Sequence, residues 1–256
     1  MNKPIRNALI LSCGITITGC HKTAVYTSPA IGDYLPLYAG HCITYQLDSI
    51  VYTHFGTVPE QHSYMVKDSI ENPVSDAGGR ASWRVVRYYR NEGDTSVWQP
   101  VNAYMITPLA STIELVENNL RYVKLSTPVQ DLHSWGGNAY LPFEPFNYLF
   151  DFSDADHTHP GGWNYVYQDL FTTGRINELT FSNTITVACS GVENTNFPPL
   201  DLDRKGVKTV WVEQYATGVG LVYKDIVMQE YQPVSPSVAI PYYTGFELKM
   251  SIIAYQ

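Results

Sequence analysis

Apolar and polar residues alternate along most of the chain after residue 40, the pattern of β-strands that bury one face. The alternation is most regular in residues 179–189. There the apolar positions are Leu179, Phe181, Ile185, Val187 and Cys189, and the alternate positions are Thr180, Ser182, Thr184, Thr186 and Ala188. One face of this segment is therefore predicted to lie in a core and the other to face water.

Similar patterns predict strands over residues 41–53, 62–71, 81–91, 111–117, 120–126, 163–171, 179–189, 207–215, 221–231 and 246–255. Turn-forming residues separate several of them. Asn118 and Asn119 join two strands, because Asn tolerates the positive φ angles of a tight hairpin turn. A helical pairing of Glu117 with Arg121 is the alternative, but the β-branched and aromatic neighbours favour the hairpin.

These features predict an all-β fold. Because most connections are short, we favour an antiparallel meander that forms a curved sheet or a barrel-like domain. A two-layer β-sandwich is the alternative. A chain of 256 residues is long enough for one such domain, which we expect to span residues 40–256.

Residues 127–162 interrupt the alternation with many Pro, Gly and aromatic residues. Irregular segments on a rigid scaffold often carry binding sites, so we predict a plug or lid folded onto the sheet. The candidate ligand contacts in and beside this region are Trp135, Tyr140, Phe143, Phe146 and Trp163. The alternative for each aromatic side chain is that it simply fills the core.

The N-terminal residues predict export and a lipid anchor. Lys3 and Arg6 precede an apolar stretch too short to span a bilayer, as in a secretory signal. The stretch 11–20, LSCGITITGC, resembles a bacterial lipobox, in which the final Cys is acylated and becomes the first residue of the mature protein. We therefore expect a signal peptide over residues 1–19, acylation of Cys20, for example with palmitate, and a tether over residues 20–39. An ordinary signal peptide and an uncleaved anchor are the alternatives.

Charge and composition limit the partners. Without Lys3 and Arg6, 14 basic side chains face 24 acidic ones, a sum of about −10. Such a surface repels phosphate backbones, so nucleic-acid binding is not expected. The lipid alone would then hold the protein at the membrane, because no basic patch assists it. Because His21 rather than Asp follows Cys20, we expect the outer membrane, with the domain facing the periplasm.

Two cysteines remain once Cys20 is acylated. Cys42 and Cys189 are a candidate disulfide in an oxidising compartment, and two separate thiols are the alternative.

Several stretches together carry a resemblance to a known family. They are DYLPL (33–37), DSIVY (48–52), ENNLRYVKL (117–125), WGGNAY (135–140) and YATGVGLVYK (215–224). In these stretches the chain resembles a family of uncharacterised Gram-negative envelope lipoproteins. The resemblance runs along nearly the whole mature chain and implies an architecture, but it supplies neither catalytic residues nor a function. Thr217 stands where the family usually has Pro.

One polar cluster has metal-ligating residue types. Asp154, Asp156, His157 and His159 alternate closely enough to converge on a cation. The cluster lacks the Gly and distal Glu of a calcium loop, so a solvated acidic loop is the favoured interpretation. His133 beside Ser134 has no nucleophile-elbow motif, and the glycine pairs at 136–137 and 161–162 lack the lysine of a phosphate loop. We predict no catalytic residues and no cofactor.

Two functional hypotheses follow. The favoured one is a non-enzymatic envelope lipoprotein that binds a small ligand or a protein partner through residues 127–162. The alternative is a metal-dependent, hydrolase-like activity at residues 154–159.

Overall fold

Most of the chain forms one antiparallel sheet. The computed structural model describes residues 28–95, 97–189 and 193–256, and within them the sheet has 13 strands. The strands are β1 (Cys42–Thr53), β2 (Val58–Ser75), β3 (Ala81–Asn91), β4 (Gln99–Pro108), β5 (Thr112–Glu117), β6 (Leu120–Ser126), β7 (Ser134–Trp135), β8 (Tyr165–Ile176), β9 (Leu179–Cys189), β10 (Glu193–Thr195), β11 (Gly206–Ala216), β12 (Gly220–Gln232) and β13 (Tyr242–Tyr255).

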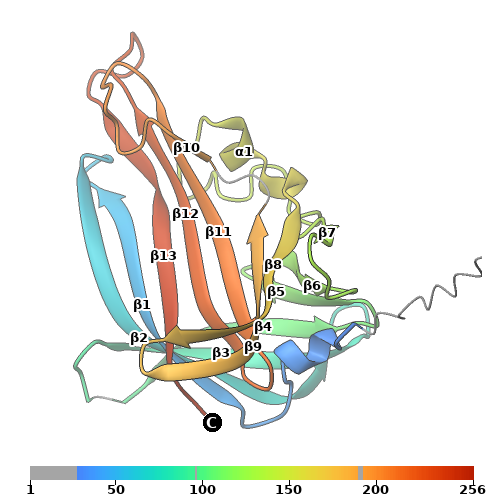
Figure 1. Cartoon of the computed structure of the whole chain (residues 1–256). Helices are drawn as coiled ribbons and strands as arrows, with labels where there is room; N and C mark the ends of the chain where they lie inside the picture. Colours follow the sequence, from blue (N-terminus) through green and yellow to red (C-terminus); the bar gives the residue numbers. More distant parts are fainter. Residues whose placement is uncertain (1–27, 96, 190–192) are drawn as a thin grey trace, which may run out of the picture.

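The strand order is that of a meander in two halves. One half consists of β1 to β6, each beside the next. The other half consists of β13, β12, β11, β9, β8 and β7 in that order, and β10 pairs with β11. The halves join where β1 pairs with β13, from Ile43 opposite Tyr255 to Val51 opposite Phe246. In Figure 1, β11, β12 and β13 are long strands that stand side by side, and the sheet curves away from them through β2 to β6. The predicted antiparallel curved sheet is confirmed, and the sandwich is not formed.

The two edge strands approach each other and nearly close the barrel. The Trp135 indole on β7 donates a hydrogen bond to the Val123 carbonyl on β6 at 2.8 Å. The Val123 amide in turn donates to the Gly137 carbonyl at 2.8 Å, and the Tyr167 hydroxyl on β8 donates to the Ser126 carbonyl at 2.7 Å. Side chains and loop residues thus replace a regular strand pairing at this seam.

The predicted hairpin at residues 118–119 is confirmed: Asn118 and Asn119 have φ angles of 53° and 62° between β5 and β6. Strand β4 was not predicted from the sequence. Pro100 and Pro108 lie near its ends, where they hide the strand pattern, although both pair with neighbouring strands.

Residues 127–164 fold onto the inner face of β11, β12 and β13, as a plug was predicted to do. Phe152 and Trp163 are buried, and Phe150 stacks on Phe246 of β13 with ring centroids 5.2 Å apart. The segment contains one helical turn, α1 (Ala155–Thr158), beside the upper parts of β8 and β11 in Figure 1. It occupies part of the space that the curved sheet encloses.

The first described residues also pack into the domain. A short 3₁₀ helix, η1 (Ile31–Tyr34), buries both of its terminal side chains in the core. The Gly218 amide donates a hydrogen bond to the Asp33 carbonyl at 2.7 Å and holds this helix against the turn between β11 and β12. The packed domain therefore begins before residue 40, within the segment expected to be a tether.

The core is unusually rich in tyrosine, and this predicts alkaline sensitivity. Burial, together with nearby carboxylates, raises the pKa of Tyr45, Tyr104, Tyr165 and Tyr215 well above the ordinary value. The unfolded chain ionises its tyrosines near pH ~10, whereas the folded protein keeps these four neutral. Stability is therefore expected to be complete below pH ~10 and to fall as pH rises above it.

The measurement is an ultraviolet titration of tyrosinate, followed in parallel by circular dichroism. The buried tyrosines should ionise together with the loss of the β-sheet signal, and the same titration in denaturant should show all tyrosines ionising near pH ~10. A native protein whose tyrosines all titrate there while the sheet persists would contradict the burial described.

Candidate functional site

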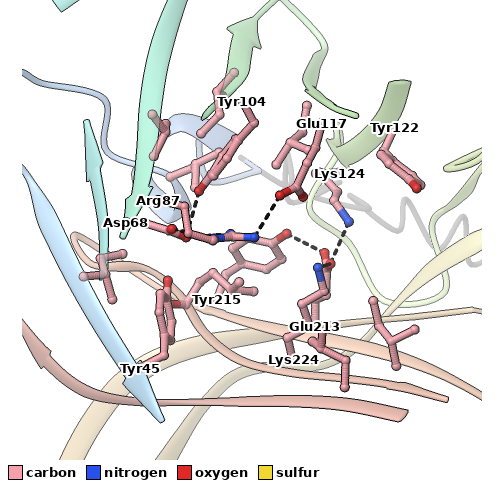
Figure 2. Close-up of a pocket in the computed structure, with 18 of the residues that line it drawn as sticks. Tyr45, Asp68, Arg87, Tyr104, Glu117, Tyr122, Lys124, Glu213, Tyr215 and Lys224 are labelled. Atoms are coloured by element: carbon pink, nitrogen blue, oxygen red, sulfur yellow. Dashed lines mark hydrogen bonds and ion pairs between the residues drawn. The ribbon is translucent and has the colours of Figure 1, made fainter. Parts of the chain in front are cut away.

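A cavity of about 200 Å³ lies inside the curved sheet. Its walls are mostly apolar and come from both halves of the meander, including Ile43, Ile106, Leu115, Phe146, Ile226 and Phe246. Ten tyrosine and charged side chains labelled in Figure 2 lie around this space. Eight of them form two groups of largely buried polar side chains, which we call the arginine group (Asp68, Arg87, Tyr104, Glu117) and the lysine group (Lys124, Glu213, Tyr215, Lys224).

The arginine group is fully bonded around its guanidinium. Arg87 donates from Nε and Nη2 to the two oxygens of Asp68 at 2.7 and 2.8 Å, and from Nη1 to Glu117 Oε1 at 2.8 Å. The Tyr104 hydroxyl donates to Asp68 Oδ2 at 2.9 Å. Burial alone would lower the pKa of Arg87, but Asp68 and Glu117 raise it well above the ordinary value. The cation therefore stays charged between its two carboxylates.

The lysine group centres on one carboxylate. Glu213, with 2% of its side chain exposed, accepts hydrogen bonds from Lys124 Nζ at 2.6 Å and from the Tyr215 hydroxyl at 2.7 Å. Lys224 Nζ lies farther away, 3.8 Å from Glu213 Oε1. Burial alone would raise the pKa of Glu213, but the two lysines lower it. Burial lowers the pKa of Lys224, and Lys124 lowers it further.

The strands bring these groups together because charged residues occupy core-facing positions. Arg87 shares the parity of Val85 on β3, and Glu213 lies between Trp211 and Tyr215 on β11. The sequence analysis did not single out these charges. A usable signal was present, since an ionisable residue on the apolar parity of a strand needs a partner inside the core.

The predicted aromatic ligand contacts are scattered. Phe146 alone among them lines the cavity, and Trp163 packs in the core against Trp211, with ring centroids 5.6 Å apart. Trp135 packs on Tyr167 at the barrel seam. Tyr140 and Phe143 are 59% and 76% exposed, so they are not part of an enclosed site. The five residues do not form one binding surface.

The four candidate metal ligands, Asp154, Asp156, His157 and His159, do not come together, and His157 does not lie in a solvated loop. His157 is fully buried, and its two ring nitrogens lie 3.1 Å from Glu230 Oε1 and 2.6 Å from Thr209 Oγ1. His159 stacks on Phe143 instead. The histidines therefore have structural partners, because residues 154–159 close onto β11 and β12 as a helical turn rather than as an extended loop.

The two aspartates of that set lie in another environment. Asp154 caps α1 by accepting from the Asp156 amide at 3.0 Å, and it pairs with Lys205 at 3.2 Å. Oxygens of Asp154, Asp156 and Glu193 lie within 4.8 Å of one another at the surface. These carboxylates gather without the two histidines, so the chemistry expected of an aspartate–histidine site is absent from the described residues.

No disulfide joins Cys42 and Cys189. Cys42 lies on β1 and Cys189 on β9, and β13, β12 and β11 separate these strands in the sheet. The Cys42 thiol donates to Ser69 Oγ at 3.2 Å. Cys20 and the lipobox lie outside the described residues, so the predicted acylation stays a prediction.

The described residues contain no helix long and apolar enough to cross a membrane. No protein-family model matches the sequence, and no curated protein matches it either. A crystal structure from Bacteroides fragilis, described as that of an exported protein with a YmcC-like fold, is similar to 86% of this chain and 99% of its own chain. The identity is 10% and the TM-score is 0.32, values too low to carry an argument about this protein.

The arginine group predicts a strong effect of Arg87→Leu on stability. The substitution leaves Asp68 and Glu117 buried beside each other without their cation, which is expected to cost about 3–5 kcal/mol of unfolding free energy. Arg84→Leu is the matched control on the same strand. Its ion pair with Glu71 is 53% and 40% exposed, so the loss should stay below about 1 kcal/mol.

Urea unfolding of both variants and the parent protein measures the difference. Equal losses in the two variants would show that the buried arginine is not the electrostatic centre described.

Proposed function

We propose that this protein is a lipid-anchored envelope protein that binds a small, largely apolar molecule inside its curved sheet and does not act as an enzyme. The observation that carries the proposal is the cavity of about 200 Å³ with mostly apolar walls inside the curved sheet. Well-packed cores rarely contain voids larger than a water molecule. A cavity of this size in an otherwise dense core therefore favours an occupant.

The size of the cavity limits the ligand. An engineered protein cavity of about 150 Å³ holds benzene, so about 200 Å³ suits one ring or a short chain with a small polar group. The interior position excludes a folded protein as the occupant. The proposed binding site is therefore the interior of the sheet and not the surface of residues 127–162, where the sequence analysis expected it.

The proposals for the lipid anchor and for the cellular location rest on the sequence. The stretch ending in Ile17-Thr18-Gly19-Cys20 and the short apolar run before it support acylation of Cys20. Two or more acyl chains hold a protein firmly on a bilayer without a spanning helix. We place the protein on the outer membrane, with the domain on the periplasmic side and no nucleic-acid partner.

Filling the cavity should expel the ligand. Leu115 lines the cavity from β5, and Leu115→Trp adds bulk to the space that the ligand would occupy. Native mass spectrometry of protein purified from its own periplasm should find a bound organic mass in the parent protein and none in this variant. Leu120→Trp is the control, since Leu120 lies on the same hairpin but does not line the cavity.

Circular dichroism of each variant verifies that it is folded. A parent protein without any bound mass, or a Leu115→Trp variant that keeps the parent's bound mass, would refute binding in this cavity.

The anchor predicts the effect of Cys20→Ala. This variant should not incorporate labelled palmitate and should leave the membrane fraction, because no acyl chain remains to hold it. Cys13→Ala is the control, since Cys13 lies in the segment removed with the signal peptide. Fractionation and labelling of cells carrying each variant test this, and a membrane-bound, labelled Cys20→Ala protein would refute it.

A further inference from the structure

Lys224 is the least satisfied charge around the cavity. It lies on β12 at the cavity wall, and 17% of its side chain is exposed. Among the described residues, its nearest charged partner is Glu213 at 3.8 Å, too far for a hydrogen bond. A lysine ammonium has three N–H donors, so its hydrogen-bonding capacity is open.

Glu213 does not compensate for two lysines. It already accepts a hydrogen bond from Lys124 at 2.6 Å and another from Tyr215 at 2.7 Å. The lysine group therefore holds two positive charges against one negative charge. Lys224 is the cation of this group without a close partner, because Lys124 is the closely paired lysine.

A second open donor lines the same cavity. The indole Nε1 of Trp211 is buried and has no hydrogen-bond partner within the described part of the chain. Trp211 lies two residues before Glu213 on β11, and Lys124 Nζ is 5.8 Å from the centre of its ring. A buried donor without an acceptor is costly, so this region lacks an acceptor rather than a donor.

The cation of the arginine group, by contrast, is closely paired. The guanidinium of Arg87 is held by both oxygens of Asp68 and by Glu117, and Glu117 also accepts from Asn102 at 3.0 Å. Its two carboxylates are held by close hydrogen bonds from Arg87, Tyr104 and Asn102, although their two negative charges face the single positive charge of Arg87. An acidic ligand group consequently finds its complement at the lysine group.

We infer that the cavity binds a small organic carboxylate, with the carboxylate against Lys224 and the apolar body against the walls formed by residues such as Ile106 and Ile226. This inference rests on the proposed function, since it names the chemical class of the ligand in the same cavity. A carboxylate supplies the acceptors that Lys224 and Trp211 lack and gives Lys224 the close partner that it does not have in the lysine group. Charge-assisted hydrogen bonds inside a low-dielectric cavity are stronger than the same bonds in water.

Three probes of one chain length test the inference: hexanoate, 1-hexanol and hexylamine, each titrated into the protein by calorimetry. The protein is first unfolded and refolded to remove any resident molecule. Hexanoate should bind at least about tenfold more tightly than hexanol, the effect of one or two hydrogen bonds to a charged group. Hexylamine should bind most weakly, because its ammonium brings further donors to a region where Lys224 and Trp211 already lack acceptors among the described residues.

Lys224→Met distinguishes the contribution of the lysine charge to binding from that of the apolar cavity walls. The variant keeps a side chain of similar length and leaves the Lys124–Glu213 pair intact, so it should fold. Its hexanoate affinity should fall to that of hexanol, while hexanol binding changes by less than about twofold. Lys224→Arg is the matched control, which keeps the charge and should retain the preference for hexanoate.

The outcomes are distinguishable. Equal binding of hexanoate and hexanol by the parent protein would overturn the carboxylate inference and leave apolar binding in place. The same inference fails if Lys224→Met keeps the preference for hexanoate. Binding of none of the three probes would overturn the proposed function together with this inference. The comparison of probes on the parent protein needs no variant, so it stands even if Lys224→Met does not fold.

Discussion

The pairing of β1 with β13 is the constraint on which the rest of the structure depends. It joins the first strand of the domain to the last. Cys42 and Gln256 extend the pairing, since the amide of each donates to the carbonyl of the other, at 3.1 and 2.9 Å. The His41 ring contacts the carbonyls of Gln256 and Val219, both at 2.8 Å. Without this long-range pairing, the two halves of the meander would be separate sheets with exposed edges.

The same pairing explains how the buried charges meet. Asp68 and Arg87 lie on neighbouring strands of the first half, so their contact is local to the sheet. Lys124 and Glu213 belong to different halves and meet only because the sheet curves around the interior. A buried ion pair contributes little net stability compared with apolar packing, whereas losing one partner is costly. The Lys124–Glu213 pair therefore favours the arrangement in which β6 and β11 face each other. It also places charged groups at this part of the interior.

The predictions for the candidate site failed for an identifiable physical reason. His157 and the aromatic residues of 127–162 looked available because an irregular segment carries no periodicity that shows what it covers. In the structure the segment turns inward, and His157 is satisfied by Glu230 and Thr209, which are distant in sequence. The charged residues that do surround a cavity were not recognised, although they share the apolar parity of their strands. Which face of a strand is inside depends on the curvature of the whole sheet.

By itself, the sequence determined what depends on local order along the chain. Alternation such as that of residues 179–189 establishes strands, and paired Asn residues establish a hairpin, because side-chain period and turn conformation are local properties. The stretch that resembles a lipobox is likewise a local pattern of the sequence. Only the tertiary structure decided that β1 closes on β13, that residues 127–164 occupy part of the interior, and that Lys224 lines a cavity without a hydrogen-bonding partner at its ammonium among the described residues. These facts depend on contacts between residues far apart in sequence, whose geometry emerges only when the sheet closes.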